Sequence, residues 1–157
     1  MKRTALAASI AFVLASTAVA GPPVQESLTT VLGPKAYRDG DVIEIIDVAA
    51  TSPRLEQGDS VTVKGRVRLD SQDAANLCLF VTQTEGDGKE EVDSPQTVRV
   101  SRGLAGFELK TTIKHRGVLH VTMYDFASGK PIGGVYFGTA EQMKRIAEWD
   151  VDYYLAE

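Results

Sequence analysis

The sequence predicts an all-β protein, an antiparallel β-sandwich of about seven strands with a short C-terminal helix. Short runs of apolar and β-branched residues recur along the chain, separated by turn residues at intervals of about 8–12 positions. Several runs alternate apolar and polar residues, which is typical of antiparallel sheets with one solvated face. No long helical pattern lies between them, so a parallel α/β sheet is not expected.

Residues 1–20 have the composition of a secretory signal peptide. Two basic residues precede an apolar run over residues 5–15, and Ala18 and Ala20 supply the small residues of a cleavage site. The apolar run is shorter than the about 20 residues that a membrane-spanning helix needs. We therefore expect cleavage after Ala20, a periplasmic or extracellular protein, and no membrane insertion after cleavage.

The mature chain has the size of one domain. Removal of 20 of the 157 residues leaves 137, and we expect a lead-in segment over residues 21–40. Residues 41–157 then form a single β-sandwich domain with a C-terminal helical extension. Once the two basic residues of the signal peptide are removed from the 17 in the sequence, 15 remain against 21 acidic ones. This balance argues against nucleic acid and anionic membranes as partners, because both attract basic surfaces.

The first half of the mature chain contains one ambiguous element and three predicted strands. Residues 28–32 form a short edge strand or a single helical turn, which Gly33 and Pro34 end. Residues 60–69 give the clearest strand, because Val and Leu alternate with Thr, Lys and Arg in period two. The other two predicted strands cover residues 41–50 and 76–84.

The second half continues with four predicted strands and ends in a helix. The strands cover residues 97–101, 107–113, 117–126 and 132–138. Thr139 and Gln142 have the spacing of a capping box, which predicts a short helix over residues 140–147. Apolar and polar residues then alternate from Trp149 to Leu155, which indicates a final strand or a continued helix.

Two segments resemble strands of bacterial immunoglobulin-like and fibronectin-III-like domains. Residues 55–63 (LEQGDSVTV) pass through Gly-Asp into alternating Val and Thr, as the second strand of such domains does. Residues 117–121 (GVLHV) open with Gly, as their sixth strand often does. The resemblance covers residues 41–138 and implies an immunoglobulin-like sandwich, an architecture that does not fix function. The chain departs from antibody domains at Leu119, where they carry a tyrosine, and in having no cysteine in the second or sixth strand.

Cys78 is the only cysteine in the sequence, so the chain forms no internal disulfide. It lies in an apolar run, and we expect a buried, inert thiol. Together with His115, His120 and Met123 it offers the ligand types of a copper site in a β-sandwich. Such a site gathers its ligands on one late loop, whereas His120 and Met123 alternate to opposite faces of one strand. We therefore predict no metal and no cofactor, and His115, His120 and Cys78 are the candidates for a metal-handling alternative.

Two groups of residues are candidates for a partner surface. One is aromatic and lies near the C-terminus: Trp149, Tyr153 and Tyr154. The other is the polar face of one strand: Lys64, Arg66 and Arg68. Aromatic residues are enriched in interfaces, and the alternative is that they fold back and complete the core. The basic residues form either an anion-binding surface or a solvated face paired with acidic residues across the sheet.

The sequence contains no nucleophile motif of the type Gly-x-Ser-x-Gly or Ser-x-x-Lys, and nothing in it singles out a pair of carboxylates. It therefore predicts a secreted, non-catalytic binding or interaction module of the bacterial periplasm, whose partner is a protein or a small polar ligand. Two alternatives stay open. One is a periplasmic copper-handling protein, and the other is a small hydrolase without a recognisable motif.

Overall fold

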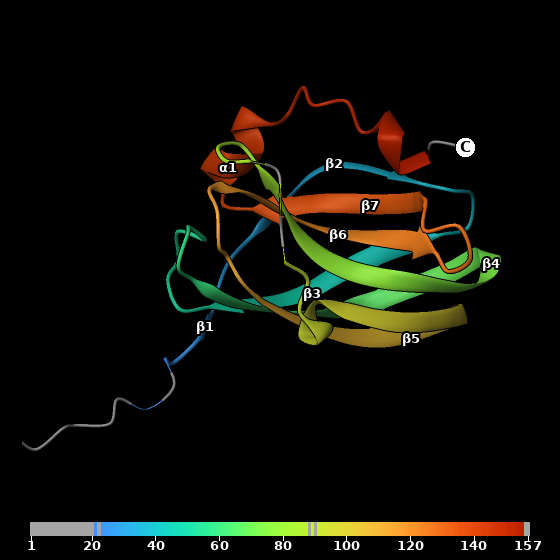
Figure 1. The fold of residues 1–157 in the computed structure, drawn as a ribbon, viewed down its shortest axis with the longest axis horizontal. Coiled ribbons are helices and arrows are strands. Elements are labelled where there is room, and N and C mark those ends of the chain that lie inside the picture. The colour runs from blue at the N-terminus through green and yellow to red at the C-terminus, as the bar shows by residue number, and fades with distance from the viewer. Residues whose placement is uncertain (1–20, 22, 88, 90, 156–157) are drawn as a thin grey trace, which may run out of the picture.

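The computed structural model describes residues 21, 23–87, 89 and 91–155. The protein is mostly β, as the sequence predicts: seven antiparallel strands curl into a half-barrel sheet, and one short α-helix lies near the C-terminus (Figure 1). The predicted signal peptide, residues 1–20, lies outside the described residues.

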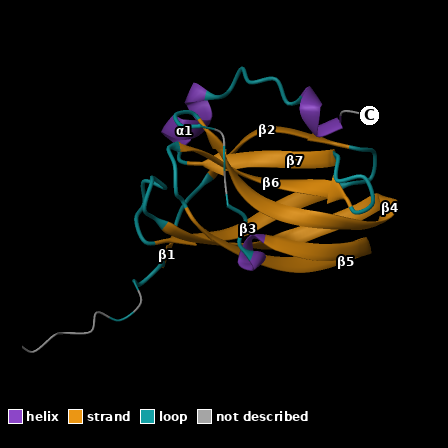
Figure 2. Cartoon of the chain, viewed as in Figure 1, coloured by secondary structure: helices purple, strands orange, loops and turns teal. Residues whose placement is uncertain are grey.

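The strands follow one another in a single hydrogen-bonded sheet (Figure 2). They are β1 (Glu26–Ser27), β2 (Val31–Tyr37), β3 (Val42–Ala50), β4 (Ser60–Gln83), β5 (Thr97–Thr112), β6 (Gly117–Asp125) and β7 (Pro131–Gly138). The helical elements are α1 (Ala140–Arg145) and two 3-10 turns, η1 (Ser94–Gln96) and η2 (Asp152–Leu155). The order across the sheet is β1-β3-β4-β6-β7-β2, and β5 pairs with β4.

Strand β4 is 24 residues long and belongs to both halves of the sheet. Its first part pairs with β3 and its second part with β6, while β5 follows it along both. The separate strands predicted at 60–69 and 76–84 are therefore two parts of β4, and those predicted at 97–101 and 107–113 are two parts of β5. Because these strands run through both halves, the two separate sheets of a sandwich are not shown.

A buried carboxylate holds the bend of β4. Asp41, just before β3, accepts backbone hydrogen bonds from Asp70 at 2.7 Å and Ser71 at 2.9 Å through Oδ1. Its Oδ2 accepts a third hydrogen bond from Ser71 Oγ at 2.6 Å. The register with β5 shifts between Leu69 and Ala74, next to this contact. Satisfying the backbone donors in this way lets the strand bend and continue, where the sequence alone indicates a turn.

The break predicted at Gly33 and Pro34 is wrong, because β2 runs through both residues. The register with β7 shifts between Leu32 and Lys35, which accommodates the proline as an irregularity within the strand. β2 pairs only with β7 and is an edge strand, where the missing N–H of a proline leaves no ladder position empty.

The sheet buries side chains on both of its faces. One core cluster fills the inside of the curl with residues from β3 to β7, among them Val63, Leu79, Val121 and Phe137. A second, smaller cluster lies on the opposite face of β6 and β7: Val118, Tyr136, Met143, Ile146 and Tyr154. Residues of the second cluster alternate with those of the first along β6 and β7, as the pleat requires. The chain after β7 therefore covers the outside of the sheet.

The capping box predicted for the C-terminal helix is confirmed. Thr139 Oγ1 accepts a hydrogen bond from the Gln142 backbone at 3.2 Å, and Gln142 Oε1 accepts one from the Thr139 backbone at 2.9 Å. The helix ends at Arg145 and leads into residues 146–155, which we call the C-terminal segment.

The final strand or continued helix predicted from Trp149 to Leu155 is wrong. This stretch begins without regular structure and ends in η2. It lies on the face of the sheet, where Tyr154 is fully buried, and does not pair at an edge. A Cβ on Gly134 of β7 would lie only 2.5 Å from the Tyr154 ring. The glycine therefore provides the space in which this tyrosine packs.

Candidate functional site

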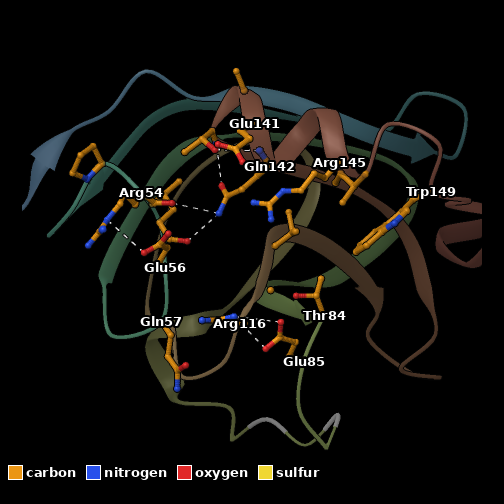
Figure 3. Close-up of a pocket in the computed structure, with 17 residues that line it drawn as sticks. Arg54, Glu56, Gln57, Thr84, Glu85, Arg116, Glu141, Gln142, Arg145 and Trp149 are labelled. Carbon is orange, nitrogen blue, oxygen red and sulfur yellow. Dashed lines mark hydrogen bonds and ion pairs between the residues drawn. The ribbon is translucent and has the colours of Figure 1, made fainter.

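A cleft of about 1150 Å³ opens at the end of the half-barrel where β6 begins and β7 ends. Three parts of the chain form its walls: the loop between β3 and β4, the chain around residues 84–85 and 116–118, and α1 with the start of the C-terminal segment (Figure 3). We call it the end cleft. Buried side chains of Leu55, Val118 and Ile146 provide the apolar part of its lining.

The loop wall of the end cleft is fixed by hydrogen bonds to one carboxylate. Asp59 accepts from Thr51 Oγ1 at 3.2 Å and from Ser52 Oγ at 2.9 Å, and the Glu56 backbone donates to it at 2.8 Å. Within this loop Leu55 is buried and has a φ of 53°, a left-handed conformation that is uncommon outside glycine. Such a backbone persists only where its surroundings hold it in place.

The helix wall is joined to the loop wall through Gln142. Its Nε2 donates to the backbone oxygens of Leu55 at 3.1 Å and Arg54 at 3.4 Å. Gln142 is itself buried and forms half of the capping box that starts α1. The capping interaction thus also fixes the distance between two walls, so the end cleft is formed before any ligand arrives.

Three arginines and three glutamates line the end cleft. Arg54 pairs with Glu56 and Arg116 pairs with Glu85, each at 3.4 Å and each with exposed side chains. Arg145 points into the middle of the cleft, with Gln142 on one side and Trp149 on the other (Figure 3). Within the described part of the chain, its side chain has no hydrogen bond or ion pair. The end cleft therefore contains one guanidinium that no group of the described residues neutralises.

Trp149 connects the end cleft to the aromatic cluster on the outside of the sheet, which we define as Phe80, His120, Tyr136, Trp149, Tyr153 and Tyr154. Its ring lines the cleft and packs edge-on against Tyr136, with centroids 5.6 Å apart and an interplanar angle of 85°. Tyr136 is buried, and its hydroxyl oxygen lies 2.9 Å from Thr82 Oγ1 and 2.6 Å from the Tyr153 hydroxyl oxygen. Burial raises the pKa of Tyr153, so its hydroxyl group stays protonated at neutral pH.

His120 lies inside the aromatic cluster and does not line the end cleft. Its ring centroid is 5.1 Å from that of Tyr136 and 6.1 Å from that of Tyr154, and its Nδ1 lies 2.7 Å from Thr122 Oγ1. Burial lowers the pKa of His120 to about 3, so the imidazole is neutral in the physiological range. A buried neutral histidine with a hydroxyl partner is a packing residue first.

Cys78 and His120 lie on the same face of the sheet, because Cys78 pairs with Thr122 in the register of β4 and β6. Cys78 is buried, Thr97 Oγ1 donates to its sulfur at 3.4 Å, and burial raises the pKa of the thiol. His115 lies in the turn before β6, five residues before His120. The described residues contain no group of three or more His, Cys, Asp or Glu side chains arranged to hold a metal ion.

The basic residues of β4 lie on a solvated face with acidic partners on both neighbouring strands. Arg66 contacts Glu44 of β3 at 3.0 Å, and Lys64 contacts Glu108 of β5 at 3.5 Å. Arg68 stands opposite Val42 and Leu104 in the register. Cross-strand pairing of this kind is the solvated-face alternative of the sequence analysis.

The three aromatic residues predicted as a partner surface belong to one cluster but differ in exposure. Tyr154 is fully buried, Trp149 is half-buried beside the end cleft, and Tyr153 is 43 % exposed.

Sequence reasoning missed Arg54, Arg116 and Arg145. They come from three distant segments, so no spacing in the sequence joins them, and only the curl of the sheet brings them to one cleft.

Comparison of the chain with protein-family models, with curated proteins and with solved structures finds no match. None of the described helices is long and apolar enough to cross a membrane.

Proposed function

We propose that the protein is a secreted, non-catalytic binding module of the bacterial periplasm, and that the end cleft is its site for a small polar ligand. The observation that carries the proposal is the cleft itself, about 1150 Å³ in volume and walled by segments that Gln142 ties together. Ligand sites are concave and largely formed in advance, with a few polar groups that fix orientation. The end cleft has these properties.

The hydrolase alternative has less support. Among the described residues, the one imidazole–hydroxyl pair at hydrogen-bond distance is His120 with Thr122, which is buried beneath the C-terminal segment and not in the end cleft. With a pKa of about 3, His120 is also a weak base at neutral pH. The copper-handling alternative would need His115, His120 and Cys78 in one place, and the described residues contain no group of three or more His, Cys, Asp or Glu side chains arranged to hold a metal ion.

The immunoglobulin-like classification belongs to the proposal as well. Its support is the larger of the two core clusters. Both halves of the sheet contribute side chains to this cluster, as the two sheets of a sandwich contribute to their common core. The continuous strands β4 and β5 distinguish the present sheet from two separate ones.

The test uses a panel of periplasmic small molecules: sugars, sugar phosphates, amino acids and dicarboxylates. Binding is followed by the fluorescence of Trp149, the only tryptophan in the sequence, and by thermal stabilisation. Ala140 lines the end cleft and is exposed, so Ala140→Phe should fill the cleft and abolish binding.

The matched control is Ala127→Phe, in the exposed turn between β6 and β7 at the other end of the sheet, which should bind normally. Every ligand should also be recovered unchanged after long incubation. Equal loss in both variants, or no member of the panel that binds, would count against the end cleft as the ligand site. Conversion of a ligand would overturn the non-catalytic part of the proposal.

A further inference from the structure

We infer that the end cleft selects a ring compound that carries an oxyanion, a carboxylate or a phosphate, with Arg145 as the residue that binds this group. The inference rests on the proposed function and adds the chemical class of the ligand. It starts from the charge balance of the cleft, where two of the three arginines have glutamate partners and Arg145 has none among the described residues.

The unpaired guanidinium is directed inward. Arg145 ends α1, and its exposed side chain extends along the cleft between Gln142 and Trp149 (Figure 3). A guanidinium offers a planar fork of donors that matches the two oxygens of a carboxylate or phosphate. The guanidinium faces a cavity whose walls have a lower dielectric constant than water. Its attraction for an anion is therefore stronger than it would be on an open surface.

The acidic residues of the cleft do not cancel this charge. Glu56 pairs with Arg54 on the loop wall, and Glu85 pairs with Arg116 on the wall formed by residues 84–85 and 116–118. Glu141 is one helical turn before Arg145 and also lines the cleft, yet no ion pair joins the two. Glu141 therefore repels an incoming anion without neutralising the group that binds it, and its removal should tighten anion binding.

Trp149 is the reason why we expect the ligand to contain a ring. Its side chain lines the cleft beside Arg145 and is held by the edge-on contact with Tyr136 and by the chain on either side. A rigid indole next to a guanidinium gives an apolar surface and a charged group at neighbouring points. A ring with an anionic substituent can contact both at once, whereas a bare inorganic anion contacts only Arg145.

The test compares three probes of one shape: glucose, glucuronate and glucose 6-phosphate. They carry no charge, a carboxylate and a phosphate, respectively, and Trp149 fluorescence reports on the cleft directly. We expect both anionic probes to bind more tightly than glucose by about tenfold or more. Which of the two binds more tightly distinguishes a carboxylate ligand from a phosphate ligand. Inorganic phosphate should bind more weakly than glucose 6-phosphate.

Variants locate the interaction. Arg145→Gln should weaken binding of the anionic probes by about tenfold, and Arg145→Lys by less, since it keeps the charge and loses the fork. Glu141→Gln should strengthen the binding of the anionic probes. The matched control is Lys144→Gln, which removes the same charge from the neighbouring exposed residue of α1 that does not line the cleft. It should change the Kd by less than about twofold, because an exposed charge outside the site is screened.

The outcomes separate this inference from the proposed function. If glucose binds as tightly as the anionic probes and Arg145→Gln does not change its binding, the selection of an oxyanion is overturned. The end cleft would remain a binding site. A Lys144→Gln loss as large as that of Arg145→Gln would show general electrostatics and overturn the role of Arg145. A third outcome is that none of the three probes binds, while another member of the panel binds and Ala140→Phe abolishes that binding. This outcome would overturn the inference alone. Failure of the whole panel would overturn both.

Discussion

The phenolic oxygens of Tyr136 and Tyr153 lie 2.6 Å apart, and this contact fastens the C-terminal segment to the sheet. Tyr136 is buried in β7, and its hydroxyl oxygen also lies 2.9 Å from Thr82 Oγ1 of β4. The three hydroxyl groups form a chain that extends from β4 to η2. Since Trp149 packs on the ring of the same Tyr136, the contact also positions one wall of the end cleft.

Tyr153→Phe should lower the free energy of unfolding by about 1 kcal/mol, the net value of one part-buried hydrogen bond. Tyr136→Phe should cost more, because it removes the partner of both Thr82 and Tyr153. Urea denaturation of the two single variants and the double variant measures the coupling between the residues. An additive double variant would show that the two hydroxyl groups contribute independently.

Gly134→Ala should lower the free energy of unfolding by about 1–3 kcal/mol, as overpacking of a well-filled site does. The added Cβ would lie 2.5 Å from the ring of Tyr154 and 2.8 Å from Thr122 Oγ1. Gly106→Ala is the control, since its Cβ would meet nothing closer than 3.8 Å in the paired strand β5. Thermal melts of the two variants compare them. A Gly134→Ala variant as stable as Gly106→Ala would mean that Tyr154 does not pack where the structure has it.

The stability should fall with acid in a way that depends on His120. Burial holds the pKa of His120 at about 3 in the folded protein, below the ordinary value of 6.5 for the free side chain. The unfolded chain therefore binds a proton that the folded protein does not, and the stability is lost as the pH falls below 6.5. The free energy of unfolding should drop by about 2 kcal/mol between pH 7 and pH 5.

Urea denaturation at several pH values checks this loss of stability. His120→Gln should flatten the dependence in this interval, whatever its effect on the absolute stability. His115→Gln is the control, and it should keep the slope of the unsubstituted protein. A slope that survives in His120→Gln would assign the proton to another group.

The thiol of Cys78 should react slowly with maleimide in the folded protein and rapidly in urea. Burial both shields the sulfur and raises its pKa, so little thiolate is present at neutral pH. A Ser128→Cys variant adds an exposed thiol in the turn between β6 and β7 as an internal reference. Mass spectrometry should find one rapidly labelled cysteine in that variant and none in the unsubstituted protein. Equal rates at the two positions would contradict the burial of Cys78.

Elements whose signals are local could be predicted from the sequence. Residues 42–50, 117–125 and 131–138 form strands at nearly the predicted positions, and Thr139 with Gln142 starts the helix, because alternation and capping act within a few residues. The bend of β4 could not be predicted as a bend, because Asp41 satisfies the backbone of Asp70 and Ser71 from 29 and 30 residues away.

The alternation of apolar and polar residues after Trp149, which indicated a final strand or a continued helix, has a different origin. A segment that lies on the face of a sheet also buries some residues and exposes others, and Tyr154 is buried while Tyr153 is exposed. Gly134 in β7, distant in sequence, leaves the space that the ring of Tyr154 occupies. The end cleft was likewise beyond the sequence, because Arg54, Arg116 and Arg145 become neighbours only through the topology.

The pairing of β2 with β7 has a consequence for how the chain reaches its native state. Val31 stands opposite Gly138 in the register, so the first long strand gains its partner only when β7, about 100 residues further along the chain, packs beside it. Until then β2 is an unpaired edge with exposed Val31 and Leu32, a feature that favours self-association. Sheets closed by such distant contacts fold slowly. Late in folding, the N-terminal edge of the sheet is therefore the part of this chain most open to pairing with a second copy.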